Sequence, residues 1–226
     1  MTAVGRVRGW PATLIEPDQL GAPVVLQPAR VADARARRAV RAANDSWLRP
    51  WNPTSPCARS RHSPAGLLAA MIRWSPVPAY LAAVRGQREA RLGTAFSWVI
   101  RYGSQFAGEV TIWHVQWGPT RSAEVGYWID ERLAGRGIMP TALALCADHC
   151  FREMGLHRLE AGIQPKNTAS RRVVEKLGFR EEGTRIRLVH VDGSWQDHIS
   201  YAITAEETPD GLLARWRSSL AASRTP

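Results

Sequence analysis

The chain has 226 residues, of which 45% are hydrophobic and 22% charged, and its formal net charge is +10 at pH 7. This length suits one domain with a sizeable core, and the composition excludes a chain that is disordered throughout. The positive charge is compatible with nucleic acid, the ribosome, anionic lipid or an acidic cofactor as a partner. Because Lys166 and Lys176 are the only lysines, the arginine excess is equally typical of a GC-rich coding bias.

The cysteines and the hydropathy pattern exclude several classes of protein. Cys57, Cys146 and Cys150 include no CxxC pair, which favours neither a disulfide framework nor a zinc site. We therefore expect no metal and a reducing, cytoplasmic location. The first twenty residues contain Pro11 and Pro17 and no apolar run, and no other stretch is long enough to cross a bilayer, so we expect neither a signal peptide nor membrane contact.

Three regions are expected along the chain. Residues 1–20 show no hydrophobic period and are predicted to be a flexible leader, 21–206 the domain, and 207–226 a short exposed C-terminal tail. The elements expected in the first half of the domain are a strand at 24–27, a helix over 32–47, a helix that opens near 63 and carries Met71, and a further helix through 84–89.

After Gly93 the chain becomes rich in β-branched and aromatic residues. The segments "AFSWVIRY", "FAGEVTIWHV" and "SAEVGYWID" are separated by turn residues and predict three antiparallel strands. A helix is predicted over 139–154, and its apolar stripe includes Cys146 and Cys150, which we therefore assign to the core.

The remaining elements are expected to be a strand, a helix and two further strands. "HRLEAGI" predicts the first strand, and "NTASRRVVEKLG" predicts a helix with Asn167 as N-cap and Gly178 at its C-terminal end. "FREEGTRIRLVHV" and "QDHISYAI" predict the last two strands, joined by a turn at "DGSW". Trp195, Asp197 and His198 are expected to pack and to form hydrogen bonds there without touching substrate.

The segment "RLAGRGIMPTAL" predicts an anion site between a strand that ends near Ile129 and a helix that begins near Ile138. Gly135 and Gly137 allow positive φ and close backbone approach, and free N–H groups at the helix start favour a pyrophosphate. The spacing is neither the G-x-G-x-x-G of a dinucleotide fold nor the G-x-x-x-x-G-K-[ST] of a nucleotide-binding P-loop.

The run R-x-x-G-x-G at 132–137 resembles that of the GNAT family of acyl-CoA-dependent N-acetyltransferases, and within it the RimJ/RimL group of protein N-terminal acetyltransferases. The similarity extends over 124–202 and includes "NTAS", "EKLGF" and "DGSWQDH" in this order. It implies a mixed α/β fold with a mostly antiparallel sheet of six to seven strands, a splayed parallel pair and flanking helices.

The resemblance also implies acetyl-CoA as co-substrate. Its pyrophosphate would bind the backbone amides of 133–138, and its pantetheine arm would lie between the strands that end near Ile129 and Ile163. The cofactor-binding residues that the resemblance implies are Tyr127, Trp128, Ile129, Arg132, Leu133, Ala134, Gly135, Arg136, Gly137, Ile138, Asn167 and Ser170.

Acetyl transfer requires a neutral amine, stabilisation of an oxyanion and a proton for the departing thiolate. Asn167 and Ser170 match the N-x-x-S of the family, so that Ser170 would give or relay the proton and Asn167 would orient CoA or a water molecule. RimL-type relatives carry a glutamate on the strand that here has Val189 and His190 without a carboxylate. Glu109 and Glu124 are candidate bases that would act through water, and His114 and Tyr201 are further candidates.

The missing glutamate favours an α-amine acceptor, because about 9 to 17% of an α-amine is neutral at pH 7 against about 0.04% of a lysine. We therefore predict a cytoplasmic enzyme that acetylates the N-terminus of a protein, with ribosomal proteins among the acceptors. Contact with nucleic acid is expected only through the ribosome. Two alternatives stay open: an acetyltransferase for polyamines, aminoglycosides or amino acids, and a non-catalytic module that binds the ribosome or RNA. Trp47, Trp51 and Trp74 are expected in an acceptor groove or in the core.

Overall fold

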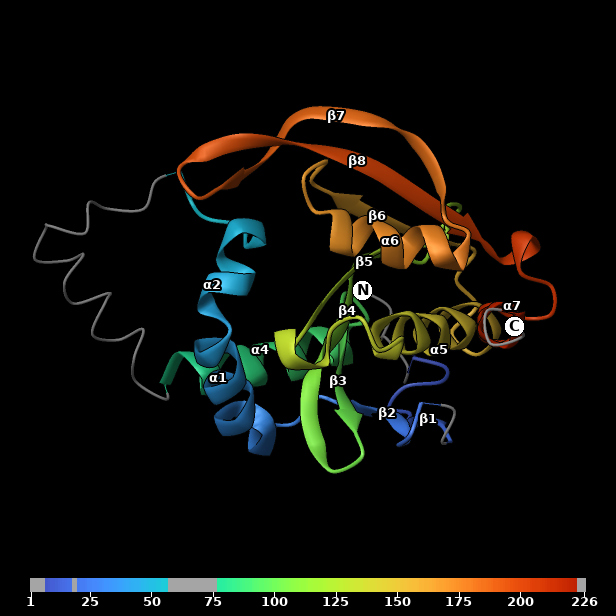
Figure 1. Ribbon diagram of the computed structural model, residues 1–226, viewed down its shortest axis with the longest axis horizontal. Helices are drawn as coiled ribbons and strands as arrows, with labels where there is room; N and C mark the ends of the chain where they lie inside the picture. The colour runs from blue at the N-terminus through green and yellow to red at the C-terminus, as the bar shows by residue number, and fades with distance from the viewer. Residues whose placement is uncertain (1–6, 18–19, 57–76, 223–226) are drawn as a thin grey trace, which may run out of the picture.

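The computed structural model describes residues 7–17, 20–56 and 77–222, and within them eight strands form a single sheet. The strands run in the order β1-β2-β3-β4-β5-β6-β8-β7, and all neighbours are antiparallel except β5 and β6, which are parallel (Figure 1). The strands are β1 (Leu14–Glu16), β2 (Val24–Pro28), β3 (Phe96–Tyr102), β4 (Gln105–Gln116), β5 (Ser122–Ile129), β6 (Arg158–Ile163), β7 (Arg180–Val191) and β8 (Ser194–Thr204). The predicted mixed α/β fold is confirmed, with eight strands instead of six to seven.

Six α-helices flank this sheet within the described residues. They are α1 (Ala34–Ala43), α2 (Asp45–Leu48), α4 (Val77–Leu92), α5 (Ile138–Arg152), α6 (Thr168–Leu177) and α7 (Leu212–Ala222). The single helix predicted over 32–47 is divided into α1 and α2 at Asn44, and the helix predicted through 84–89 is longer than expected. The helix predicted near 63, together with Cys57 and Trp74, lies outside the described residues.

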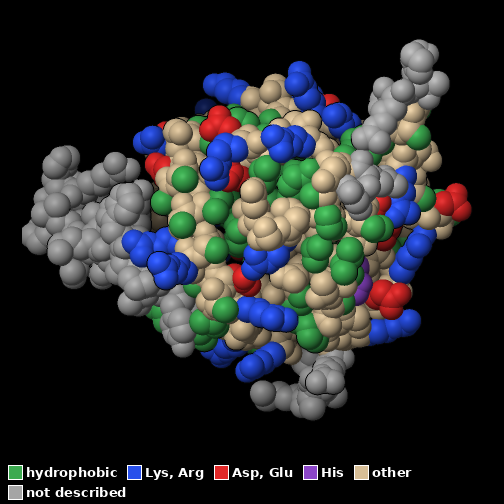
Figure 2. Space-filling view, turned by 60° about the horizontal axis from the view of Figure 1, so that its bottom comes forward, with side chains coloured by type: hydrophobic (Ala, Val, Ile, Leu, Met, Phe, Trp, Pro, Cys, Tyr) green, Lys and Arg blue, Asp and Glu red, His purple; other side chains and the backbone are tan. Residues whose placement is uncertain are grey.

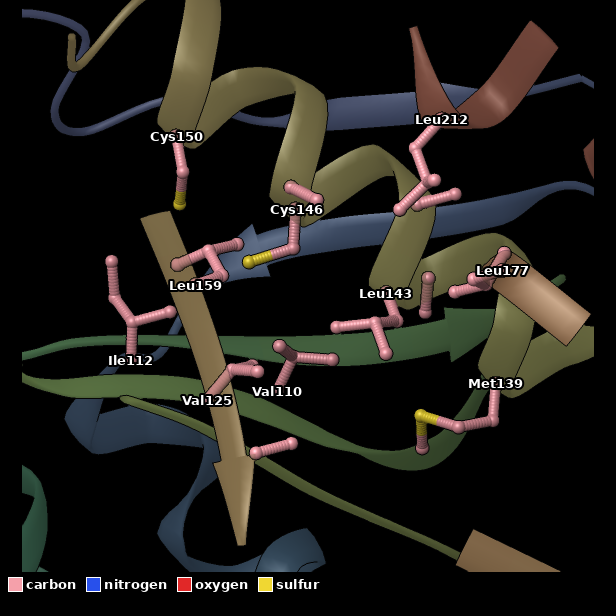
Figure 3. Close-up of a cluster of buried hydrophobic side chains, with 14 of the residues drawn as sticks. Val110, Ile112, Val125, Met139, Leu143, Cys146, Cys150, Leu159, Leu177 and Leu212 are labelled. Carbon is pink, nitrogen blue, oxygen red and sulfur yellow. The ribbon is translucent and has the colours of Figure 1, made fainter. Parts of the chain in front are cut away.

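Alternation along β4 assigns the two faces of the sheet. Val110 and Ile112 are fully buried and face α5, from which Cys146 and Cys150 project toward them (Figure 3). Glu109, which directly precedes Val110 on β4, faces the opposite side, where it is paired with Arg37 of α1. Both cysteines are free thiols in the core, and a hydrogen bond with Cys146 together with burial raises the pKa of Cys150. Their predicted packing role is confirmed.

β5 and β6 pair along only part of their length. The parallel register joins Ser122–Glu124 to Arg158–Glu160, and no pairing continues beyond these residues. The strands therefore separate toward Ile129 and Ile163, as the resemblance implied.

The helix that follows β6 has the caps that the sequence predicted. Asn167 is the N-cap of α6, with its side-chain oxygen accepting a hydrogen bond from the backbone N–H of Ser170 at 3.1 Å. At the other end of α6, Gly178 adopts the left-handed conformation that stops the helix.

The predicted flexible leader is wrong for residues 7–17. β1 pairs with β2, and the buried carboxylate of Glu16 forms an ion pair with Arg217 of α7. Trp10 packs edge-on against Phe96 and Trp98 of β3. These contacts make the segment part of the domain, and β1 accounts for the additional strand.

The predicted exposed tail is also wrong, because α7 packs against α5. Leu212 is fully buried, and the indole N–H of Trp216 donates to the hydroxyl of Thr141 at 2.8 Å. The backbone N–H groups of Leu212 and Leu213 donate to the carboxylate of Asp148, which caps the start of α7.

The positive charge is not gathered in one patch on the face that Figure 2 shows. On the face seen in Figure 2, Lys and Arg side chains are spread across the molecule with Asp and Glu side chains between them. Among the described residues, no helix combines the length and the apolar character needed to cross a membrane.

Candidate active site

A cavity of about 890 Å³ lies where β5 and β6 separate. The walls include β5 from Glu124 to Ile129, β6 from Glu160 to Ile163, the turn before α5, and the first turn of α6. Residues of α1, α2, β4, β7 and β8 line its other half. The predicted site residues that line the cavity are Glu109, Glu124, Tyr127, Trp128, Ile129, Ala134, Gly135, Gly137, Asn167 and Ser170.

The glycine turn before α5 has the backbone expected of an anion site. Gly135 and Gly137 have φ of 77° and 79°, in the left-handed region that favours glycine. Gly137 is the N-cap of α5, and no side chain caps this helix start. Backbone N–H groups at such a helix start favour an anionic group.

Four of the predicted cofactor residues have side chains that do not line the cavity. Leu133 and Ile138 are buried in the core, and the Arg136 side chain is absent from the cavity wall. Arg132 instead holds the turn, because its guanidinium donates to the buried carboxylate of Asp130 at 2.6 Å. This contact lowers the pKa of Asp130. Any contact of these four residues with a pyrophosphate would therefore come from the backbone.

Ser170 and Tyr127 connect α6 to β5 across the opening of the sheet. The Ser170 hydroxyl donates to Tyr127 Oη at 3.0 Å, and Tyr127 Oη donates to the Ser170 carbonyl oxygen at 3.0 Å. Burial raises the pKa of Tyr127, so this phenol keeps its proton. The pair is a hydroxyl chain that can supply a proton inside the cavity.

Glu109 is held by two hydrogen bonds to one oxygen and by an ion pair of Arg37 with the other. Arg37 Nε lies 2.9 Å from one oxygen and 2.8 Å from the other, and Trp128 Nε1 donates at 2.8 Å. Its side chain is only 6% exposed. This environment favours a fixed anion that orients Arg37 and Trp128 over a group that takes protons from water.

Glu124 lies beside a β-bulge in β4. The register between β4 and β5 shifts after Trp113, and His114 adopts a φ of 50° there. Trp113 Nε1 donates to Glu124 at 3.1 Å, and His114 Nδ1 lies 3.3 Å from its other oxygen. Gly126 allows this arrangement, because a Cβ at that position would lie 2.3 Å from the Trp113 ring.

The comparisons with known proteins agree with this geometry. Residues 24–180 match the model of the acetyltransferase (GNAT) domain. This chain belongs to the GNAT acetyltransferase family. The predicted family and the predicted class, an acyl-CoA-dependent N-acetyltransferase, are thereby confirmed.

Solved and curated relatives lie within the RimJ/RimL group or carry the name of N-acetyltransferases. The structure of Mycobacterium smegmatis RimJ in complex with a CoA disulfide is 38% identical, with a TM-score of 0.79, over 96% of this chain and 97% of that one. Bacillus subtilis YjcK, a probable N-acetyltransferase, is 42% identical over 42% of this chain and 53% of its own. The Escherichia coli [ribosomal protein uS5]-alanine N-acetyltransferase is 33% identical over 43% of this chain and 49% of its own. The chain thus spans about half the length of the curated relatives it matches.

Of Val189 and His190, on the strand where the resemblance implied a glutamate, Val189 lines the cavity and His190 does not. The Nδ1 of His190 lies 2.7 Å from the hydroxyl of Thr54, and its ring packs edge-on against Trp195. Trp47 and Trp51 do line the cavity, which supports the acceptor groove that the sequence left open.

The sequence interpretation missed two polar residues on β6 and β8. His198 lines the cavity and is buried, and since a carbonyl oxygen can only accept, its Nδ1–H donates to Gln196 O at 3.1 Å. In the neutral ring this leaves Nε2 as an acceptor. Glu160 also lines the cavity, where Arg158 and Arg185 donate to it. In "HISYAI", Ile199, Tyr201 and Ile203 occupy alternate positions and face the core. This alternation could have placed His198 on the opposite face of the sheet, the face of Glu124.

Arg41 is the third missed residue. It lies one helical turn after Arg37 on α1, with its guanidinium 5.0 Å from the centre of the Trp128 ring, and it lines the cavity. The i, i+4 spacing places the two arginines on one helix face, but the sequence does not indicate that this face meets the sheet. Among the described residues, no group of three or more His, Cys, Asp or Glu side chains could hold a metal.

Proposed function

We propose that this chain transfers the acetyl group of acetyl-CoA to the N-terminal α-amine of a protein, by direct attack of the amine on the thioester. The observation that carries the proposal is the cavity itself. It extends from the glycine turn before α5, through the gap between β5 and β6, to a half lined by carboxylates and tryptophans. Donor and acceptor can therefore enter from opposite sides of the sheet and meet at the gap.

The half of the cavity formed by the glycine turn, the separated ends of β5 and β6 and the start of α6 is the donor half, and it suits CoA. Beyond Glu124, the edge of β5 that faces β6 has no strand partner, so its backbone groups are available to an extended pantetheine arm. The turn over 132–138 would receive the pyrophosphate. Arg172 and Lys176 of α6 also line the cavity and add positive charge near the phosphates. The bound CoA of the M. smegmatis RimJ structure supports this assignment.

The acceptor half would receive the amine at Glu124, at the end of the paired part of β5 and β6. An ammonium group is attracted to this carboxylate and can lose its proton to it, directly or through a water molecule. The neutral amine then attacks the carbonyl carbon, forming the C–N bond, and the C–S bond breaks. Asn167 would orient CoA or a water molecule near the reacting atoms.

The departing CoA thiolate needs one proton, and the hydroxyl pair at Ser170 would supply it. Ser170 would turn its O–H from Tyr127 to the sulfur and give its proton there, and the phenol of Tyr127 would turn its O–H from the Ser170 carbonyl oxygen to the serine oxygen while solvent restores the proton. The nitrogen loses two protons, the first from the ammonium before attack and the second after the C–N bond has formed, and both pass through Glu124 and water to solvent. Protons therefore balance without a metal or a redox cofactor.

A protein acceptor is supported by the relatives and by the cavity wall. The E. coli relative is named as a [ribosomal protein uS5]-alanine N-acetyltransferase, which supports a protein acceptor. The four tryptophans of the acceptor half, Trp47, Trp51, Trp113 and Trp128, offer an apolar surface on which a peptide can lie. A ribosomal protein is the acceptor that we propose, and a cytoplasmic location goes with it.

The test is a competition between amines within a single peptide. A peptide with a free N-terminus and an internal lysine is incubated with the protein and acetyl-CoA, and fragment mass spectra locate the acetyl group. We expect acetylation at the N-terminus, and none on the same peptide with a blocked N-terminus. Higher kcat/KM on spermidine, an aminoglycoside or a free amino acid would contradict the protein acceptor, and no transfer to any amine would contradict the enzymatic function.

A further inference from the structure

Arg41 is a partly buried cation in the acceptor half of the cavity, and no described carboxylate lies within 4.0 Å of it. Its guanidinium stacks on Trp128, with 5.0 Å between Cζ and the ring centre. One Nη donates to the side-chain oxygen of Asn52 at 3.2 Å. A guanidinium has five N–H donors, so these two contacts leave donors available to a ligand.

The other arginines of the acceptor half are already neutralised. Arg37 is paired with Glu109, and Arg185 is paired with Glu160. Among the three carboxylates of the cavity wall, Glu124 alone has no arginine partner among the described residues. The acceptor half therefore presents one available anion, Glu124, and one available cation, Arg41.

Burial makes the charge of Arg41 costly. Desolvation lowers the pKa of Arg41, and the neighbouring Arg37 lowers it further, while Glu109 opposes the shift. A desolvated cation is stabilised when an anion with good geometry pairs with it.

We propose that Arg41 binds a carboxylate of the acceptor, so that the enzyme prefers peptides with an acidic side chain at the second or third residue. This inference rests on the proposed function and adds the substrate class to it. Glu124 would hold the reacting α-amine. Arg41, which stacks on Trp128 four residues further along β5, would hold the acidic group.

The separation of the two charges favours a peptide over a free amino acid. Glu124 and Trp128 are four residues apart on a strand, which corresponds to roughly 13 Å. An extended peptide advances by about 3.3 Å per residue and adds the length of an acidic side chain. A free amino acid carries its amine and carboxylate on one carbon atom and is too short to reach both groups.

The experiment measures kcat/KM for peptides of equal length that begin with alanine and differ only by Glu or Gln at the second or the third position. We expect the Glu peptide to exceed its Gln counterpart by about ten-fold at one of these positions, as a charge-assisted contact provides. In Arg41→Gln this ratio should fall to about one, and Arg41→Lys should keep part of it. Melting curves confirm that each variant folds.

Arg35→Gln is the matched control, because Arg35 is exposed on the same helix and is absent from the cavity wall. It should keep the wild-type ratio. Equal kcat/KM for Glu and Gln peptides in the wild type, or the same ratio in wild type and Arg41→Gln, would overturn the inference while leaving the acetyltransferase intact. No transfer to any peptide would instead reject the proposed function. Arg41-dependent transfer to free amino acids above that to peptides would also overturn the inference.

Discussion

The Ser170 hydroxyl donates to Tyr127 Oη at 3.0 Å, while Tyr127 Oη donates to the backbone carbonyl oxygen of Ser170. This reciprocal pair joins the first turn of α6 to β5 at the gap in the sheet. It couples a group proposed to protonate the CoA thiolate to a phenol that burial keeps protonated.

Removal of either hydroxyl should slow the chemical step. We expect Ser170→Ala to lower kcat by about a hundred-fold, the range of one positioned proton donor, and Tyr127→Phe by about ten-fold. Because the two groups act together, the double variant should lose little more than Ser170→Ala alone. Steady-state kinetics with a saturating peptide checks this, and fully multiplicative losses would contradict a shared role.

Gly126 should be intolerant of a side chain, because a Cβ there would lie 2.3 Å from the ring of Trp113. In Gly126→Ala, Trp113 must move, and Glu124 then loses its indole donor. We expect kcat/KM for the peptide to fall by at least about ten-fold, since small displacements of positioned groups are costly. Gly118→Ala is the control, as nothing lies within 4 Å of its Cβ position. Equal kinetics of the two variants would contradict the role of Trp113.

Arg37 should matter for stability as well as for the site. Glu109 is buried, and in Arg37→Met it would keep only the indole N–H of Trp128 as a hydrogen-bond donor among its present contacts. We expect the free energy of unfolding to fall by about 1 to 3 kcal/mol, the cost of an unsatisfied buried group. Urea denaturation measures the change. An unchanged midpoint would show that Glu109 finds another partner.

His149 should make the protein less stable in mild acid. Its Nε2–H donates to the carbonyl oxygen of Gly9 at 2.8 Å, and burial lowers its pKa below the ordinary value of 6.5. The unfolded chain therefore binds a proton below about pH 6.5 while the folded protein does not, so stability is complete above this pH and declines below it.

The melting temperature of the wild type should fall between pH 7 and pH 5.5. His149→Gln keeps an N–H donor for Gly9 and cannot titrate, so its decline over this interval should be smaller. A decline of the same size in both proteins would assign the effect to other groups.

Local chemistry explains which elements the sequence predicted correctly. Asn167 and Gly178 are caps whose preferences depend on their own backbone, and "RLAGRG" encodes a turn with two left-handed residues. Each signal lies within a few residues of the structure that it predicts. The splay of β5 and β6, by contrast, followed from the family resemblance.

The failures arose where the structure depends on distant partners. β1 is three residues long, and its pairing with β2 and the ion pair between Glu16 and Arg217 leave no period in the sequence. The role of α7 depends on contacts with Thr141 and Asp148 of α5. The environments of Arg41 and Glu109 likewise require the docking of α1 on the sheet, which no local pattern encodes.

The most direct test of the account is the titration of acetyl-CoA into the wild type and into Gly135→Glu and Gly135→Asn by calorimetry. Gly135 has space around its Cβ position and a φ of 77°, which asparagine tolerates. Glutamate adds a negative charge where the pyrophosphate is proposed to lie. The account predicts micromolar binding to the wild type, retained in large part by Gly135→Asn and lost in Gly135→Glu. No binding to the wild type, or equal binding to Gly135→Glu, would contradict a CoA site at this turn.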